Sequence, residues 1–407
     1  MKLAIVTAYP PSKVTLNEYA YYLVKHFRKH QDVSELILLI DVPSEEADIH
    51  FEEEASKISV RHCWNFNSYT NLFTVMKAIN EVKPDAVLFN LQFMKFGDKK
   101  IPAALGLLLP GICKLKGIPT ITLLHNILEQ VDLKSAGFTS NKIMQKVYNF
   151  IGTTLTRFIL ASDTVAVTIS KYVEVLNEKY MAKNVKLIPH GTFEIPETPN
   201  YNIPEGSLKV MTFGKFGTYK KVEILIEAIE KIRATTNRAI EIVVAGTDNP
   251  NVPGYLKSVQ ETYKNVPQLT FTGYVAEEDV AGLFEESAVV VFPYTSTTGS
   301  SGVLHQAGSY GKAVVMPDLG DLSILVKEEG YRGEFFTPES VDSLATAIQS
   351  ILENDAYRIS LGKANYNAAT ALPMSKIVDM YMDEFNEIID RKVSGVFDVA
   401  WRKELVG

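Results

Sequence analysis

Short apolar segments alternate along this chain with longer segments of helical periodicity, and this alternation restricts the fold more than any other feature. Short apolar runs separated by helical patterns are typical of a mainly parallel sheet with helices on both faces. The sequence therefore predicts an α/β protein with two doubly wound, Rossmann-like domains that face a cleft. The runs are LAIVTAY, LILLID, DAVLFN, PTITLLH and TVAVTIS in the first half, and LKVMTF, IEIVVAG, LTFTGY, AVVVFPY and KAVVMP in the second.

The stretch GTFEIPETPNYNIPEGS separates the two series of strands and carries three prolines with little apolar periodicity. Such a stretch is typical of a linker between domains. A last helical pattern follows Pro373, outside the second series, and we expect it to cross back onto the first domain. The predicted organisation is a first domain at 1–193, a linker at 194–207, a second domain at 208–373 and a helical segment at 374–407.

The 407 residues carry a formal net charge of −7, and 46% of them are hydrophobic. That content is enough for two cores, whereas the negative charge argues against nucleic acid as a partner, because nucleic-acid binding needs a basic face. Cys63 and Cys113 are the only cysteines, so the sequence supports neither a disulfide framework nor a cysteine-ligated zinc site. Small molecules are the expected partners.

The first residues lead directly into LAIVTAY, without the regions of a signal peptide, and the longest apolar run (101–113) is shorter than the ~20 residues that cross a bilayer. We therefore expect a cytoplasmic protein. Residues 134–160 mix basic and apolar side chains with no acidic residue, a pattern suited to peripheral contact with an inner membrane face or with a lipid-linked acceptor. A packed helix with a solvated basic face explains the same pattern, and the sequence favours it.

The segment VMTFGKFGTYKKVEILIEAIEKI joins a strand-like run to a helix through a loop that holds Gly214, Lys215 and Lys220. The helical spacing predicts that the helix begins near Lys220, where free N–H groups and the positive end of the helix dipole add to the lysine charges. This arrangement is suited to a diphosphate. An ordinary strand, loop and helix with a solvated basic turn fits the segment equally well.

A second loop, after AVVVFPY, offers N–H donors at the start of a helix predicted at 303–310. Ser300, Ser301 and Gly302 precede that helix, and glycine lets the backbone approach a ligand closely. Two such sites in one domain favour a ligand with linked phosphates. Taken alone, these residues are ordinary N-cap and turn residues.

Several site signatures are missing from the sequence. It has no Asp-x-Asp pair and no metal-ligand spacing among its seven histidines, so it supports no metal-held diphosphate and predicts no metal site. It also has no P-loop and no GxSxG motif, which argues against ATP hydrolysis and serine-based acyl transfer. Cationic side chains are therefore expected to hold the phosphates.

The second half resembles the donor domain of GT-B glycosyltransferases, specifically the retaining glycosyltransferase family 4 (group 1). The resemblance is clear through 208–352 and weaker through the first half. It implies a nucleoside diphosphate sugar, UDP- or GDP-linked, as the donor substrate, with no separate cofactor, and a glycan or lipid-linked acceptor. It rests on the order of GKFGTYKK, VVAGTDN, TFTGYVAEEDVAGLFEESAVVVFPY, SSGVLHQAGSYGKAVV and PDLGD.

The resemblance also implies roles for individual residues. Lys215 and Lys220 match the basic pair that binds the donor diphosphate, with Lys215 in place of the usual Arg, and His125 matches a histidine that faces the donor sugar. These three are the implied catalytic residues. The implied donor-binding residues are Gly214, Tyr274, Val275, Thr298, Ser300, Ser301, Gly302, Val303, Leu304 and Gln306, and the acceptor-side residues are Ser12, Lys13, Asn17 and Asn126.

The sequence departs from the family at two acidic positions. The family has two Glu separated by seven residues, where this chain has Thr298 and Gln306. The Gln306 amide can still bond a ribose hydroxyl, whereas Thr298 offers only a hydroxyl to the sugar. Without a carboxylate at 298, we expect front-face attack assisted by the leaving phosphate.

The resulting hypothesis is a retaining, hexosyltransferase-like enzyme (EC 2.4) that acts in glycan, polysaccharide or glycolipid synthesis. Two alternatives stay open. A nucleotide-sugar epimerase on the same fold would need carboxylates in the cleft, and a catalytically silent nucleotide-sugar-binding subunit is suggested by the two replaced Glu. Release of nucleoside diphosphate only in the presence of acceptor distinguishes these alternatives from transfer.

Overall fold

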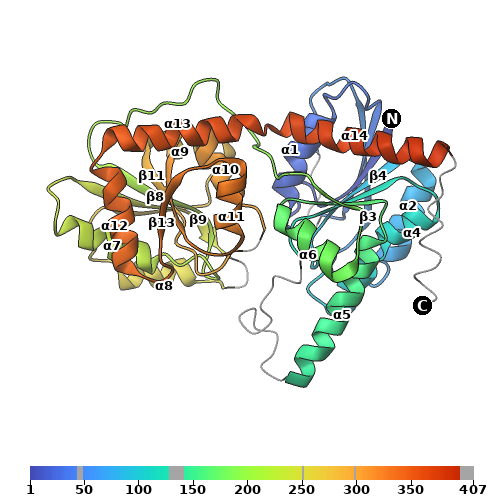
Figure 1. The fold of residues 1–407 in the computed structure, drawn as a ribbon, viewed down its shortest axis with the longest axis horizontal. Helices are drawn as coiled ribbons and strands as arrows, with labels where there is room; N and C mark the ends of the chain where they lie inside the picture. Colours follow the sequence, from blue (N-terminus) through green and yellow to red (C-terminus); the bar gives the residue numbers. More distant parts are fainter. Residues whose placement is uncertain (44–48, 128–141, 250–251, 298, 395–407) are drawn as a thin grey trace. The chain divides into compact units, whose positions relative to one another are not determined.

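The chain forms two compact α/β units in a computed structural model (Figure 1). The first unit comprises 1–189 and 374–407, and the second comprises 190–373, so that the linker predicted at 194–207 lies within the second unit. Both units have parallel sheets with helices on both faces, which confirms the predicted fold class of each. The described residues are 1–43, 49–127, 142–249, 252–297 and 299–394.

The first unit has a seven-stranded parallel sheet in the order β3-β2-β1-β4-β5-β6-β7. Its central strands are buried on both faces, as expected for strands that consist largely of apolar residues. The chain leaves β1 first toward β2 and later toward β4, so the topological switch point lies at β1. The strands are β1 (Lys2–Val6), β2 (Glu35–Asp41), β3 (Lys57–Trp64), β4 (Ala86–Leu91), β5 (Thr120–Leu124), β6 (Thr164–Val167) and β7 (Val185–Leu187).

The last helix of the chain, α14 (Met374–Val393), packs on α1 (Asn17–Phe27) in the first unit. Its buried positions Ile377, Tyr381 and Phe385 recur at helical spacing, and the Thr164 hydroxyl donates a hydrogen bond of 2.6 Å to Glu384. None of the described helices is long and apolar enough to cross a membrane. The remaining helices of this unit are α2 (Asn71–Val82), α3 (Lys100–Gly106), α4 (Leu109–Leu115), α5 (Lys142–Leu160) and α6 (Ser170–Tyr180).

The second unit has a six-stranded parallel sheet in the order β10-β9-β8-β11-β12-β13, with its switch point at β8. Gly214 of β8 and Gly246 of β9 are register partners, and a Cβ on Gly246 would lie 1.9 Å from the Gly214 carbonyl oxygen. Only glycine allows the strands to approach this closely. The strands are β8 (Leu208–Phe216), β9 (Ile240–Asp248), β10 (Leu269–Gly273), β11 (Ser287–Val291), β12 (Ala313–Pro317) and β13 (Gly333–Phe336).

Two helices of the second unit follow the loops that carry the predicted phosphate site. The first, α7, begins at Glu223 and not near Lys220, because the backbone of Lys220 forms an antiparallel bridge with Tyr294. The second, α10, begins at Gly302, one residue before the predicted start. The helices are α7 (Glu223–Arg233), α8 (Tyr255–Thr262), α9 (Glu277–Glu286), α10 (Gly302–Ser309), α11 (Gly320–Glu329), α12 (Val341–Leu352) and α13 (Asp355–Ala371).

Candidate functional site

Lys220 is a buried cation at the switch point of the second sheet, where β8 and β11 end. The residue is 8% exposed, and its Nζ lies 4.8 Å from the centre of the Tyr294 ring and donates a hydrogen bond of 3.4 Å to the Phe213 carbonyl. Burial, together with the charge of Lys215, lowers the pKa of Lys220 to about 8, and no carboxylate contributes to this shift. A buried ammonium group that has no acidic partner in the described part of the chain is suited to an anionic ligand.

The backbone around Lys220 keeps this side chain in place. Gly214 has φ +131°, and a Cβ there would lie 2.5 Å from the Lys220 Nζ, so glycine leaves the space that the lysine fills. The loops after β8 and β11 are joined by hydrogen bonds from Lys221 N to the Pro293 carbonyl at 3.0 Å and from Thr295 N to the Tyr219 carbonyl at 2.8 Å. The other predicted cation, Lys215, is exposed at the end of β8.

The second predicted phosphate loop is anchored at both ends. Ser301 is the N-cap of α10, and its hydroxyl accepts a hydrogen bond from Leu304 N at 3.4 Å. Gly299 N donates a hydrogen bond of 2.9 Å to the buried Asp321 carboxylate in the first turn of α11. These contacts fix the backbone before α10, where N–H groups and the helix dipole favour an anion. Thr298 lies outside the described residues.

The other predicted donor residues lie at the same edge of the sheet. Tyr274 and Val275 follow the end of β10, with Tyr274 83% exposed and Val275 half-buried. In α10, Val303 and Gln306 are half-buried, whereas the side chain of Leu304 is fully buried and packs inside the unit. The carboxyl ends of β8, β10 and β11 therefore hold all the described donor residues predicted from the sequence.

Two stacked histidines lie beneath the start of α10, and the sequence did not predict this contact. The rings of His190 and His305 are 4.9 Å apart with planes 9° from parallel, and a Cβ on Gly302 would lie 3.8 Å from the His190 ring. Burial lowers the pKa of His190 to about 4 and also lowers that of His305, so both rings are neutral at pH 7. Residues 115 positions apart carry no local signal for such a stack.

The buried His305 ring connects this stack to other polar groups. Its Nδ1 lies 2.9 Å from the Tyr331 hydroxyl, and its Nε2 lies 3.3 Å from the Ser300 hydroxyl and 3.5 Å from Glu329 Oε2. Burial raises the pKa of Glu329 to about 8. His305 therefore fixes Ser300 beside the predicted phosphate loop.

In the first unit, His125 is held at the end of β5. Its Nε2 lies 2.7 Å from Asn90 Oδ1, and Asn90 in turn donates a hydrogen bond of 3.0 Å to the Thr7 hydroxyl. Because the amide nitrogen of Asn90 is the donor to Thr7, Oδ1 is the acceptor and His125 Nε2 carries a proton. The next residue, Asn126, has a buried Oδ1 without a hydrogen-bond partner among the described residues.

The predicted acceptor-side loop after β1 is fixed by polar groups from neighbouring strand ends. Ser12 hydrogen-bonds the Asp41 carboxylate at the end of β2, and Asn17 Nδ2 donates a hydrogen bond of 2.6 Å to the Ser12 carbonyl. Lys13 in the same loop is exposed. These hydrogen bonds bring Ser12 and Asn17 together. The exposed side chain of Lys13 is not part of this hydrogen-bonded group.

A fully buried lysine that the sequence did not reveal also holds this loop. Lys95 donates a hydrogen bond of 2.7 Å to the Thr15 carbonyl, and burial lowers its pKa to about 7 against the opposing charge of Asp41. Lys95 belongs to no motif. Asp41 and Asn90, by contrast, carried a usable signal, since each interrupts an apolar run near a strand end.

The described His, Cys, Asp and Glu residues form no group of three or more that could hold a metal ion. The cations at the edge of the second sheet are lysines. The ammonium groups of these lysines are suited to direct hydrogen bonds with phosphate oxygens.

Residues 207–354 match the family model described as "Glycosyl transferases group 1". The predicted resemblance to group 1 glycosyltransferases is therefore confirmed over this segment, which covers the two predicted phosphate loops and α10. No curated protein sequence matches the chain.

Solved structures with the same fold cover almost the whole chain. Anabaena HepE in complex with UDP has 16% identity and a TM-score of 0.66, over 95% of this chain and 100% of that one. Sucrose-phosphate synthase from Thermosynechococcus elongatus has 15% identity and a TM-score of 0.70, over 95% and 99%. A UDP-forming α,α-trehalose-phosphate synthase from Burkholderia xenovorans has 10% identity and a TM-score of 0.66, over 95% and 100%. The likeness confirms the GT-B fold class.

Proposed function

We propose, from the match of residues 207–354 to group 1 glycosyl transferases, that the chain transfers a sugar from a nucleoside diphosphate sugar to an acceptor hydroxyl with retention. The observation that carries the proposal is the buried ammonium group of Lys220, which has no acidic partner among the described residues at the switch point of the second sheet. Solved structures of Anabaena HepE contain UDP and UDP-glucose, which makes UDP the first nucleotide to test.

In the proposed reaction the bond between the anomeric carbon and the phosphate oxygen breaks, and the acceptor oxygen bonds the same face of that carbon. The acceptor proton passes to the leaving phosphate. Negative charge develops on the departing diphosphate, where Lys215, Lys220 and the N–H groups at the start of α10 stabilise it. This stabilisation is the main catalytic contribution of the second unit.

Product analysis tests the proposed function directly. The protein is incubated with UDP-glucose, and free UDP is measured with and without a mixture of candidate acceptors. A transferase releases UDP only when acceptor is present. Conversion of the donor sugar without UDP release identifies an epimerase, and tight UDP binding with no turnover identifies a silent binding subunit.

Gln306 is expected to bond a ribose hydroxyl of the donor. Gln306→Leu should weaken binding of nucleoside diphosphate by about 1–3 kcal/mol, because the hydroxyl loses its partner in a half-buried site. Gln306→Glu is the matched control, and it should bind as tightly as the parent or more tightly, since a carboxylate is the stronger acceptor. Calorimetric titration of nucleoside diphosphate measures the affinity of both variants. Parent-like affinity in Gln306→Leu would remove this residue from the site.

Sugar transfer is expected to survive an excess of chelator. The proposal assigns the diphosphate to lysines and backbone N–H groups, and the described residues offer no cluster of metal ligands. The measurement is the initial rate in EDTA compared with the rate after magnesium or manganese is added back. A rate that falls to background in EDTA and returns with either ion would contradict the assignment.

A further inference from the structure

A series of hydrogen bonds leads from the loop before α10 into the interior of the second unit. The Ser300 hydroxyl lies 3.3 Å from His305 Nε2, and His305 Nδ1 lies 2.9 Å from the Tyr331 hydroxyl. Tyr331 in turn hydrogen-bonds the Thr192 side chain, and the Thr192 hydroxyl donates a hydrogen bond of 2.9 Å to the Ala369 carbonyl. The series therefore connects the candidate phosphate loop to groups that are far from it in sequence.

The carbonyl at the inner end fixes the direction of every bond in this series. A carbonyl can only accept, so Thr192 gives its single hydroxyl proton to Ala369 and accepts a hydrogen bond from Tyr331. Tyr331 then has no proton left for His305, so His305 Nδ1 carries a proton and donates it to Tyr331. Because the His305 ring is neutral, its Nε2 carries no proton and accepts a hydrogen bond from the Ser300 hydroxyl.

Neighbouring groups hold the His305 ring in this form. The ring of His190 stacks on it at 4.9 Å, with planes 9° from parallel, and so fixes its plane. Glu329 Oε2 lies 3.5 Å from Nε2 and has no hydrogen-bond partner among the described residues. Burial raises the pKa of Glu329 to about 8, so at pH 7 no carboxylate beside Nε2 holds a proton there. At the inner end, Thr192 N donates a hydrogen bond of 2.8 Å to the Leu372 carbonyl.

We propose that His305 is a positioning residue that keeps the Ser300 hydroxyl as a hydrogen-bond acceptor for a hydroxyl of the donor sugar. On the proposed function, on which this step rests, the ribose lies at Gln306, one turn into α10, and the diphosphate lies at the first N–H groups of that helix. Ser300 precedes the N-cap, Ser301, so it lies on the side of the diphosphate where the sugar follows. An oxygen whose proton is given to His305 suits a sugar hydroxyl and not a phosphate oxygen.

Calorimetric titration separates a sugar contact from the phosphate site. The probes are the nucleotide sugar that the parent binds most tightly among UDP- and GDP-hexoses and the corresponding nucleoside diphosphate. Ser300→Ala should weaken binding of the nucleotide sugar roughly threefold to tenfold, which is the loss of one hydrogen bond, and should leave binding of the diphosphate within about twofold. Deoxy sugars identify the contacted hydroxyl, because its removal should weaken binding to the parent but not to Ser300→Ala.

A purely structural role of the same pair gives a different result. Ser300 and His305 occupy positions N′ and N4 of α10, and side chains at these positions often pair to fix how the chain enters a helix. If that were their only role, Ser300→Ala would weaken the nucleotide sugar and the diphosphate equally. Equal weakening would overturn the proposal.

NMR of the ligand-free full chain tests the proton positions directly. With isotope-labelled histidine nitrogens, the signals that His305→Phe removes are those of His305, and at pH 7 we expect Nδ1 with a proton and Nε2 without one. Tyr331→Phe removes the acceptor of Nδ1, so the proton should move to Nε2 and be donated to Ser300. Nucleotide-sugar affinity should then fall about threefold or more, although Tyr331 lies behind His305. A proton on Nε2 in the parent would overturn the proposal whether or not a nucleotide binds.

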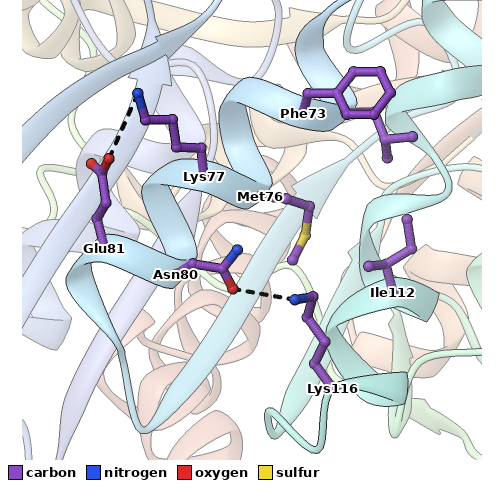
Figure 2. A pocket seen from close by; sticks show the side chains of 8 residues that line it. Phe73, Met76, Lys77, Asn80, Glu81, Ile112 and Lys116 are labelled. Carbon is purple, nitrogen blue, oxygen red and sulfur yellow. Dashed lines mark hydrogen bonds and ion pairs between the residues drawn. The ribbon is translucent and has the colours of Figure 1, made fainter.

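Met76→Ala is the control for a general loss of stability. Met76 is 8% exposed and lines a groove between α2 and α4 in the first unit (Figure 2). Its truncation should lower the unfolding temperature, because it leaves a cavity, while both affinities stay within about twofold of the parent. Weaker nucleotide-sugar binding in Met76→Ala would overturn the assignment of the Ser300 effect to a sugar contact. A parent that binds none of the nucleotides would refute the proposed function and the sugar contact with it, whereas the NMR result decides the state of His305 independently.

Discussion

Lys220→Ala is expected to lower kcat/KM for sugar transfer by roughly 30-fold to 1,000-fold while the protein stays folded. Removing one positive charge aimed at a developing anion costs about 2–4 kcal/mol in the transition state. The fold should tolerate the change, because burial already disfavours the charged form of this lysine in the free protein. Steady-state kinetics give the effect on the reaction, and thermal unfolding followed by circular dichroism gives the effect on the fold.

Lys221→Ala is the matched control for this substitution. Lys221 is the next residue in the same loop, and its Nζ lies 3.2 Å from the Gly217 carbonyl and 5.1 Å from the centre of the Tyr255 ring. We assign no donor contact to it and expect less than about a threefold change in kcat/KM, which is under 1 kcal/mol. Parent-like turnover in a folded Lys220→Ala protein would refute the diphosphate assignment.

The affinity for nucleoside diphosphate is expected to fall up to tenfold for each pH unit above about 8. The pKa of Lys220 is about 8 in the free protein, against an ordinary value of 10.5, so above pH 8 the free lysine is neutral. A bound diphosphate raises that pKa again, since it stabilises the ammonium form. Binding above pH 8 therefore takes up a proton, and its cost grows with pH.

Calorimetric titration of UDP at several pH values, in two buffers of different ionisation enthalpy, measures this proton uptake. The carboxyl of Glu329 also has a pKa of about 8, so the comparison with Lys220→Ala isolates the contribution of Lys220. The variant should bind more weakly at pH 7, with a shallower fall above pH 8. Identical slopes in parent and variant would contradict the prediction.

The same pKa shift has a consequence for the free protein. Between pH 8 and 10.5 the unfolded chain keeps the proton of Lys220 and the folded chain releases it, so this group makes the folded state more stable as pH rises. The contribution disappears below about pH 8, where both states are protonated. Denaturant titrations of parent and Lys220→Ala at several pH values measure the difference.

Burial explains which strands could be predicted from the sequence. The central strands of both sheets are buried on both faces, so each appears as a continuous apolar run, such as LILLID for β2. The strands that this pattern missed are β3, β7 and β13, and all three lie at the edge of a sheet, whereas the edge strand β10 was predicted from LTFTGY. The missed strands have exposed positions, as the partly exposed KISVRHCW of β3 shows, and they lack a continuous apolar run.

The site was predictable only where its contacts are local in sequence. Glycines, lysines and serines next to a strand end indicated the two candidate phosphate loops, because the chemistry proposed for them depends on the adjacent helix start. The start of α7 was not predictable, since Tyr294, more than 70 residues away, holds Lys220 in a bridge. Lys95 was missed for a similar reason, because its burial depends on how β4 and the loop after β1 pack.

The packing of α14 on α1 affects how the chain folds during synthesis. The second unit is one continuous stretch, 190–373, and all of it leaves the ribosome before α14 does. The first unit lacks α14 until residues 374–393 have also left the ribosome, and until then the surface of α1 that α14 covers has no partner helix. The first unit therefore begins to be synthesised before the second unit, but it is completed after the second unit.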